Sequence, residues 1–139
     1  MKIFLDIDGV MVHAIPSISI PLMDDGFYKF NNESVSTFNL LTRGYEHEVI
    51  LSSSHRFRYT NEEWVIKLKR RGLRIFKLTI MDESTEKMSR KMEIYEHILN
   101  HKLKPEEIIV IDDDKSLNSS NLKVIHPSPL HGLRFSDIK

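Results

Sequence analysis

Five short apolar runs recur along the chain, each followed by polar or turn-forming residues. Runs of this length that are rich in Ile, Leu, Val and Phe are typical of strands buried on both faces. The expected strands are residues 2–7, 48–51, 73–80, 108–111 and 122–125.

The stretches between these runs carry apolar residues at helical spacing. Each opens with a residue that favours a helix N-cap, and the first two close at a glycine. Strands that alternate with helices of this length predict an α/β fold, namely a doubly wound, mostly parallel five-stranded sheet with helices on both faces. The helices are expected between Asn31 or Asn32 and Gly44, between Thr60 and Gly72, and from Ser89 to about Leu99.

Residues 11–30 interrupt this alternation. Apolar and polar positions are mixed there with two prolines, and the sequence Asp24-Asp25-Gly26 favours a turn. We expect a flap or hairpin after the first strand. The 139 residues suit one domain, so residues 1–139 are interpreted as a single unit with 11–30 as its only large excursion.

Composition narrows the class of protein. Twenty basic residues balance twenty acidic ones, so no global charge directs the chain to nucleic acid or to a membrane. There is no cysteine, which excludes disulfides and thiol chemistry and fits a reducing compartment. No run approaches the length of a membrane span, and a cytoplasmic protein is expected.

Polar clusters follow three of the expected strands. Asp6 and Asp8 end the first, serines 52–54 end the second, and residues 112–114, all Asp, end the fourth. Ligands of parallel sheets bind beyond the carboxyl ends of the strands, and carboxylates gathered there repel unless a cation joins them. Magnesium prefers oxygen ligands and bridges to phosphates. The sequence therefore predicts a magnesium site at this edge.

These clusters and one lysine resemble the four motifs of the haloacid dehalogenase (HAD) superfamily of phosphotransferases. The motifs appear in the family's order as Asp6-Ile7-Asp8-Gly9-Val10, Ser52, Lys91 and Asp112-Asp113. The resemblance spans most of the chain and implies a Rossmann-like phosphatase domain. Four weak motifs in the right order make a strong combined signal.

The resemblance implies a division of labour among the carboxylates. Asp6 would be the nucleophile that forms an aspartyl-phosphate, and Asp8 would be the general acid and then the general base. Magnesium would be held by the Asp6 carboxylate, the backbone carbonyl of Asp8 and Asp113, with Asp112 assisting.

The resemblance also implies two groups that bind the phosphate. Ser52 would donate to a phosphoryl oxygen, although Ser53 is one position away and remains open as the alternative. Lys91 would balance the phosphate's charge, and it is better placed than Lys87 relative to the apolar face of its helix.

The substrate is less clearly marked. The chain has no room for the cap domain that many HAD proteins insert, so an open site is expected. Residues 52–56 are similar to small phosphatase domains of RNA-repair proteins, with His55 where Trp is more usual, and His55 and Arg56 are candidates for the substrate rim. We therefore expect nucleotides or phosphorylated nucleic-acid ends, with phosphoproteins, small metabolites or a non-catalytic phosphate-binding role as alternatives.

A basic stretch follows the second expected helix start. Because cations are favoured at helix C-termini, we expect its side chains to form a solvated surface rather than a phosphate site. They are Lys67, Lys69, Arg70, Arg71, Arg74 and Lys77.

Overall fold

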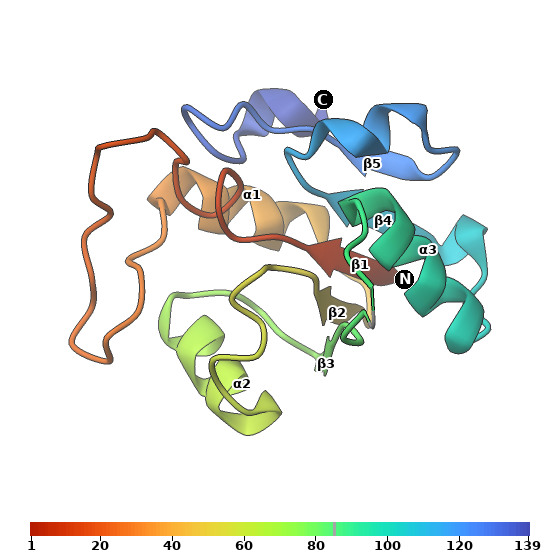
Figure 1. The fold of residues 1–139 in the computed structure, drawn as a ribbon. Coiled ribbons are helices and arrows are strands. Elements are labelled where there is room, and N and C mark those ends of the chain that lie inside the picture. The colour runs from red at the N-terminus through yellow and green to blue at the C-terminus, as the bar shows by residue number, and fades with distance from the viewer. Residues whose placement is uncertain (85) are drawn as a thin grey trace.

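The computed structural model describes residues 1–84 and 86–139. All strand pairs are parallel, and the strands lie in the order β3-β2-β1-β4-β5 (Figure 1). The predicted five-stranded parallel sheet is confirmed. The strands are β1 (Lys2–Leu5), β2 (Glu48–Leu51), β3 (Lys77–Ile80), β4 (Ile108–Ile111) and β5 (Lys123–Ile125).

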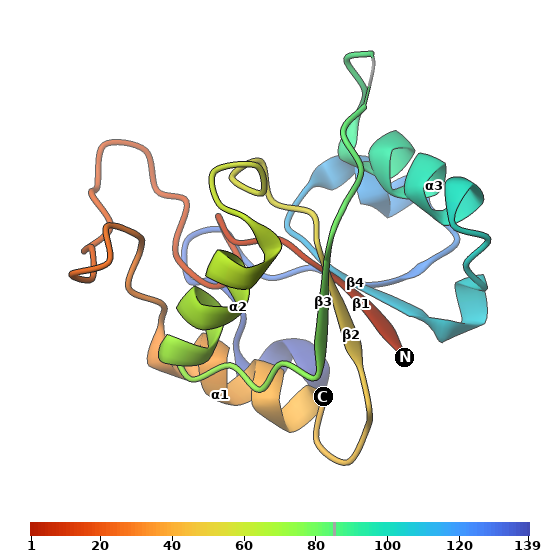
Figure 2. The ribbon, with the colours of Figure 1, turned by 90° about the horizontal axis from the view of Figure 1, so that it is seen from below.

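Helices cover both faces of the sheet, as the sequence predicts. Helices α1 (Asn32–Leu41) and α2 (Asn61–Arg70) lie on one side, and α3 (Arg90–Asn100) lies on the other (Figure 2). Alternation along β1 divides the core: Ile3 and Leu5 join the cluster beneath α1 and α2, whereas Phe4 joins the cluster beneath α3.

Local signals fix the helix ends. The Thr60 side chain accepts from the Glu63 amide at 3.2 Å, and the Glu63 carboxylate accepts from the Thr60 amide at 3.0 Å. This is the reciprocal capping expected at the start of α2. After its last turn, Gly72 adopts φ +94°, which reverses the chain toward β3.

Two predicted strands are shorter than expected. Residues 73–76 lie outside β3, because the register pairs Lys77 with Glu48 and the chain before Glu48 is a loop that offers no partner. Similarly, β1 ends at Leu5 rather than residue 7, since the chain turns immediately after Asp6. Beyond β5 the tail was expected to be irregular, but it forms a short 3-10 helix, Phe135–Ile138, that packs against α1.

The excursion at residues 11–30 is the long loop on the left of Figure 1. It contains one antiparallel bridge, Leu22 to Tyr28, and it is tied down at its far end. The Asp25 carboxylate accepts from both terminal nitrogens of Arg71 at 2.7 and 2.8 Å. Phe27 beside it is fully buried against Trp64, at 5.1 Å between ring centroids.

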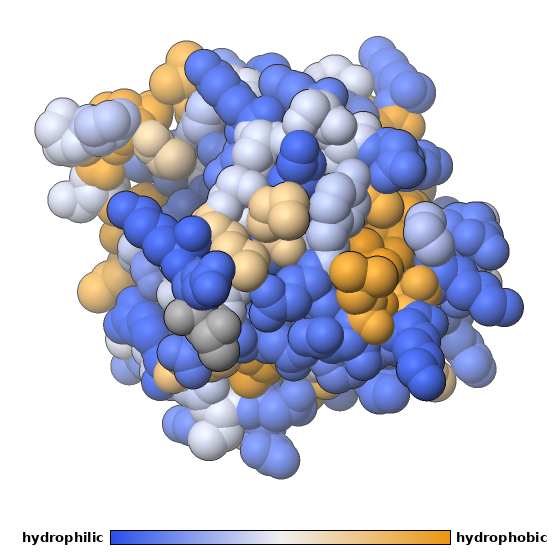
Figure 3. Space-filling model, turned by 45° about the vertical axis from the view of Figure 1, so that its right-hand side comes forward, coloured by the Kyte–Doolittle hydropathy of each residue, from blue (hydrophilic) through white to orange (hydrophobic). Residues whose placement is uncertain are grey.

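The face turned toward the viewer in Figure 3 is mostly hydrophilic, with a compact hydrophobic patch. Among the described residues, no helix combines the length and the apolar character that crossing a bilayer requires.

Candidate active site

Two buried carboxylates sit directly beyond adjacent strands. The Asp6 amide donates to Ile111 O at 3.1 Å, and the Asp112 amide donates to Ile125 O at 3.2 Å, so each residue extends the ladder by one step. Asp6 is 6% exposed and Asp112 is completely buried. Because β1 and β4 are neighbours, these hydrogen bonds bring the two side chains to the same edge.

A tight turn after β1 makes room for a third carboxylate. The carbonyl oxygen of Ile7 accepts from the amides of Val10 and Met11 at 3.1 and 2.9 Å, which folds the chain back on itself. Gly9 takes φ +78°, and a Cβ built there would overlap the Asp113 carboxylate. Glycine is therefore required at this position both for its conformation and for the space that Asp113 occupies.

Asp6, Asp112 and Asp113 each offer an oxygen, and these oxygens lie within 4.8 Å of one another. The guanidinium of Arg90 joins them, with Nη1 at 2.7 Å from Asp112 Oδ2 and 3.5 Å from Asp6 Oδ1. Three carboxylates and one guanidinium carry a formal charge of −2. A divalent cation would cancel that charge.

The crowding of carboxylates raises their pKa values. Burial and then the charge of Asp6 raise the pKa of Asp112 to about 8. The pKa of Asp6 is raised by burial against the opposing effect of Arg90, and the pKa of Asp113 is raised by burial and by Asp6. Burial alone would lower the pKa of Arg90, but the Asp112 and Asp6 charges outweigh it and raise that pKa. The site thus favours bound positive charge.

The set of donors fits a hard divalent ion such as Mg²⁺. All three converging groups are carboxylates, which is the ligand chemistry of magnesium rather than of a soft metal. The glycine cradle keeps the Asp113 carboxylate close to the turn that carries the Asp8 carbonyl. Asp6, Asp113 and that carbonyl are the groups that could hold the ion, with Asp112 beside them.

The two candidate serines behave differently. Both are fully buried beyond β2, and the Ser52 amide donates to Leu5 O at 3.0 Å. The Ser53 hydroxyl accepts from the His55 amide at 3.1 Å, whereas the Ser52 hydroxyl has no partner among the described residues. A buried hydroxyl without a partner costs free energy unless a ligand satisfies it. Ser52 is therefore the better placed of the two to bind an anion.

The structure brings Arg90, not Lys91, to the carboxylates. Lys91 Nζ donates to Ser119 Oγ at 2.9 Å, and its amide donates to Ser116 Oγ at 3.1 Å, on the side of α3 that faces residues 115–119. Successive residues of a helix point about 100° apart, so only one of the two can face the site. Arg90 was missed because both positions carry cations and only the tertiary packing separates them.

Asp8 lies at the outer side of the cluster with a more accessible side chain. Its Oδ2 is 2.9 Å from His55 Nε2, so His55 is at the site but engaged by Asp8. The rings of Phe27 and Tyr28 pack edge-on against the His55 imidazole at 5.6 and 5.4 Å between centroids. The pKa of Tyr28 is raised by burial and by the Asp8 charge, which places this residue of the long loop beside the site. No local pattern marks Tyr28.

Arg56, a candidate for the substrate rim, is placed differently. It is 6% exposed, and its side chain donates to the carbonyls of Met81, Asp82 and Ser53 at 3.0 to 3.2 Å. Its remaining bond is to Glu93 Oε2 at 3.0 Å, and Glu93 Oε1 lies 3.7 Å from Arg90 Nε. Arg56 therefore braces the residue that positions Arg90 and does not face solvent.

Asp82, His97 and His101 form a second convergent group. The two imidazoles stack at 4.1 Å between centroids, so one ion cannot lie in both ring planes. His97 Nδ1 also lies 3.2 Å from the Asp82 amide, which occupies its lone pair. This arrangement suits a hydrogen-bonded pair of rings at the end of α3 rather than a metal centre.

Comparison with known proteins gives a family. Three solved structures share the fold at low identity. One is a deoxy-D-mannose-octulosonate 8-phosphate phosphatase from Haemophilus influenzae in its cobalt-bound form, with a TM-score of 0.47, 12% identity, and 99% of this chain and 83% of that chain covered. The others are a putative 3-deoxy-D-manno-octulosonate 8-phosphate phosphatase from Vibrio cholerae (TM-score 0.41, 16% identity, 81% and 55% covered) and the phosphatase of that name from Yersinia pestis (0.39, 17%, 80% and 54%). The chain thus spans about half the length of these two.

A search of curated proteins finds no match. Residues 2–138 match a family described as the HAD domain in Swiss Army Knife RNA repair proteins. The match covers nearly the whole chain and agrees with the order of strands, the carboxylate cluster and the motif spacing. The chain belongs to this family of HAD domains.

Proposed function

We propose that the chain is a Mg²⁺-dependent phosphomonoester hydrolase that works through an aspartyl-phosphate, with nucleotides or phosphorylated nucleic-acid ends as substrates. The observation that carries this proposal is the convergence of Asp6, Asp112 and Asp113 around Arg90. The partnerless Ser52 hydroxyl provides a donor for the phosphoryl group at the same edge.

Two displacements complete the reaction. In the first, an Asp6 oxygen bonds to phosphorus as the ester P–O bond breaks, and the leaving oxygen takes a proton from Asp8. In the second, a water oxygen attacks phosphorus and gives its proton to Asp8, and Asp6 departs as a carboxylate while inorganic phosphate is released. When bound, Mg²⁺ supplies positive charge beside Asp6 and the phosphoryl oxygens.

Three side chains support these steps without changing covalently. The hydrogen bond from His55 holds the Asp8 carboxyl in one orientation, which suits a group that must donate and then accept a proton. Arg90 balances the negative charge that develops on the phosphoryl oxygens, and Ser52 donates to one of them.

Two considerations favour a polynucleotide or nucleotide substrate. The family is described from RNA repair proteins, whose substrates are nucleic acids with damaged ends. The only long excursion near the site is at residues 11–30, which leaves an open approach for a large substrate.

The test is phosphate release with and without Mg²⁺ from an aryl phosphate, a panel of nucleoside monophosphates, and oligonucleotides phosphorylated at the 3′ or the 5′ end. Asp6→Asn is the blank, and Asp24→Asn on the exposed part of the long loop is the matched control. We expect Mg²⁺-dependent release that is lost in the blank and kept in the control, with oligonucleotides or nucleotides ranked first.

Three outcomes would contradict parts of the proposal. Release that survives Asp6→Asn excludes Asp6 as the nucleophile. A ranking led by phosphopeptides or sugar phosphates, added to the same panel, replaces the substrate class. No release by folded, Mg²⁺-binding protein excludes the hydrolase and leaves a phosphate-binding module.

A further inference from the structure

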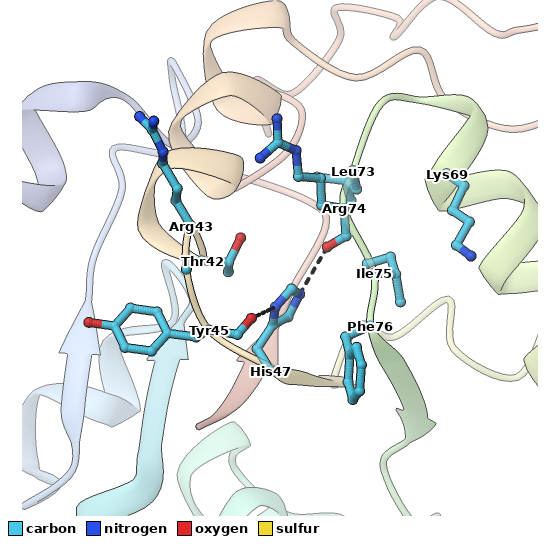
Figure 4. Close-up of a pocket in the computed structure, with 10 residues that line it drawn as sticks. Thr42, Arg43, Tyr45, His47, Lys69, Leu73, Arg74, Ile75 and Phe76 are labelled. Carbon is cyan, nitrogen blue, oxygen red and sulfur yellow. Dashed lines mark hydrogen bonds between the residues drawn. The ribbon is translucent and has the colours of Figure 1, made fainter.

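A hollow of about 420 Å³ lies at the opposite edge of the sheet, where β2 and β3 begin (Figure 4). Its volume is within the range of ligand pockets. The buried imidazole of His47 joins two of its walls: Nε2 lies 2.9 Å from the Arg74 carbonyl oxygen, and Nδ1 lies 3.5 Å from the Tyr45 carbonyl oxygen. The walls are therefore held in a fixed relation before any ligand arrives.

The hollow is basic and its cations have no ionic partners. Arg43, Lys69 and Arg74 line it, and all three are exposed. None of them forms an ion pair within residues 1–84 and 86–139, and none of the described lining residues is acidic. A concave surface with several unpaired cations concentrates anionic ligands.

The structure divides the basic stretch that the sequence suggests is merely solvated. Lys67, Arg70 and Arg71 pair with Asp24 and Asp25 of the long loop. Lys77 is 3.9 Å from Glu48. Lys69 and Arg74 are the two members left over, and both line the hollow, where Arg43 from the end of α1 joins them.

Two aromatic rings accompany these cations. Tyr45 and Phe76 both line the hollow, and each is 64% exposed. Exposed rings next to phosphate-binding cations form stacking platforms for unpaired bases. An acidic peptide would use the cations but would leave the rings without a role, so the combination favours a single-stranded polynucleotide.

The basic surface continues along α1. A second hollow of about 380 Å³ shares Arg43 and Arg74 with the first and is also lined by Asn39 and Leu40. The Asn39 side chain accepts from the Arg74 amide at 2.9 Å and donates to Gly72 O at 2.8 Å. It thereby fixes the segment before β3 against α1, and the two hollows together offer room for more than one nucleotide.

We propose that these two hollows form a binding groove for single-stranded nucleic acid. Arg43, Arg74 and Lys69 contact phosphates there, and Tyr45 and Phe76 stack on bases. The groove lies at the amino edge of the sheet and holds none of the carboxylate cluster. It is a non-catalytic site, and only the expectation that the same nucleic acid presents its end to Asp6 rests on the proposed function.

The test is the fluorescence anisotropy of a labelled, unphosphorylated single-stranded RNA of about 12 nucleotides, a length within the usual site sizes, titrated with the full chain at several salt concentrations. The double variant Arg43→Gln/Arg74→Gln should weaken binding at least about tenfold and reduce the salt slope by about 1.4, the value for two lost contacts to a single strand. Arg70→Gln, whose guanidinium already pairs with Asp24, is the matched control and should change little.

The aromatic variants separate a stacking groove from a merely basic one. Tyr45→Leu and Phe76→Leu keep every charge, and each should weaken RNA binding by about fivefold or more with little change in salt slope. Unchanged binding in both variants would overturn the assignment to single strands. So would competition by an acidic peptide that equals competition by unlabelled RNA, since it would indicate an acidic protein partner.

Hydrolysis of the aryl phosphate distinguishes failure of this proposal from failure of the proposed function. That substrate needs only the carboxyl edge, so all groove variants should hydrolyse it at the wild-type rate. RNA binding that follows the variants, in a protein that hydrolyses nothing, would sustain the groove and refute the hydrolase. Hydrolysis without RNA binding, or an effect of Arg70→Gln equal to that of the double variant, would refute the groove.

Discussion

Arg90 Nη1 lies 2.7 Å from Asp112 Oδ2 at the buried end of β4. Asp112 has no exposed surface, and its pKa is raised to about 8 by burial and by Asp6. A carboxylate in that position needs a fixed cation close by, and Arg90 is the one that the fold supplies. The neighbouring Lys91 instead joins α3 to Ser119.

Replacing Arg90 should therefore damage catalysis far more than replacing Lys91. Arg90→Gln removes the charge beside Asp6, and we expect a loss of about 100-fold in kcat/KM for an aryl phosphate, the usual effect of removing one fixed donor. Lys91→Gln should stay within about threefold of wild type. Arg90→Lys keeps the charge but not the fork, and it guards against misfolding of the Gln variant. Equal losses at positions 90 and 91 would contradict this assignment.

Removing the carboxylate of Asp113 should weaken the dependence on magnesium. Asp113→Asn keeps the shape of the side chain but removes a charge from the cluster, so the Mg²⁺ concentration for half-maximal activity should rise about tenfold or more. Asp114→Asn is the matched control, because the Asp114 carboxylate accepts from the Ser116 amide at 2.9 Å and is outside the cluster. A Mg²⁺ titration in which Asp113→Asn coincides with wild type would remove Asp113 from the ligand set.

The two serines offer a paired experiment. Ser52→Ala deletes a buried hydroxyl that has no partner among the described residues, so stability should hold or rise slightly while kcat/KM falls about 100-fold. Ser53→Ala removes the acceptor of the His55 amide, so the free energy of unfolding should fall by about 1 kcal/mol. Urea unfolding and steady-state kinetics on both variants check the pair. If Ser53→Ala lost more activity than Ser52→Ala, the assignment would be reversed.

The anchor of the long loop should show a defined pH dependence. Hydrogen bonds from Arg71 lower the pKa of Asp25 below its ordinary value of 3.8. Its contribution is therefore complete above that value and is lost as the pH falls through the lower folded pKa. Asp25→Asn should reduce the free energy of unfolding by about 2 kcal/mol at neutral pH. The difference from wild type should persist down to about pH 5 and shrink in more acidic urea titrations.

A difference that already vanished near neutral pH would contradict this account. Asp24→Asn is again the control, because Asp24 is largely exposed and its pair with Arg70 should contribute little.

The fold was predictable because its signals are local. Buried strands such as 108–111 appear as continuous apolar runs, and the capping box at Thr60 marks the start of α2 directly. The extent of β3 was not predictable, because residues 73–76 have the composition of a strand and only the missing partner before Glu48 ends the pairing.

The candidate site was predictable where it depends on strand ends and not where it depends on side-chain direction. Asp6 and Asp112 follow apolar runs, so their edge is fixed by the sheet. The choice between Arg90 and Lys91 depends on how α3 is rotated about its axis, and the burial of Arg56 depends on carbonyls of Met81 and Asp82 far along the chain. Neither relation leaves a mark in the local pattern.

The central position of β1 has a consequence for synthesis of the protein. Lys2 pairs with Glu48 on one side and with Ile108 on the other, and Gly9 must receive the carboxylate of Asp113. A nascent chain that has emerged from the ribosome only as far as β3 can pair β1 with β2, but it lacks half of the acidic cluster. Non-local pairing of this kind is formed late. Phosphate chemistry is thus withheld during translation until β4 has left the exit tunnel, which protects nearby nucleotides from a half-made enzyme.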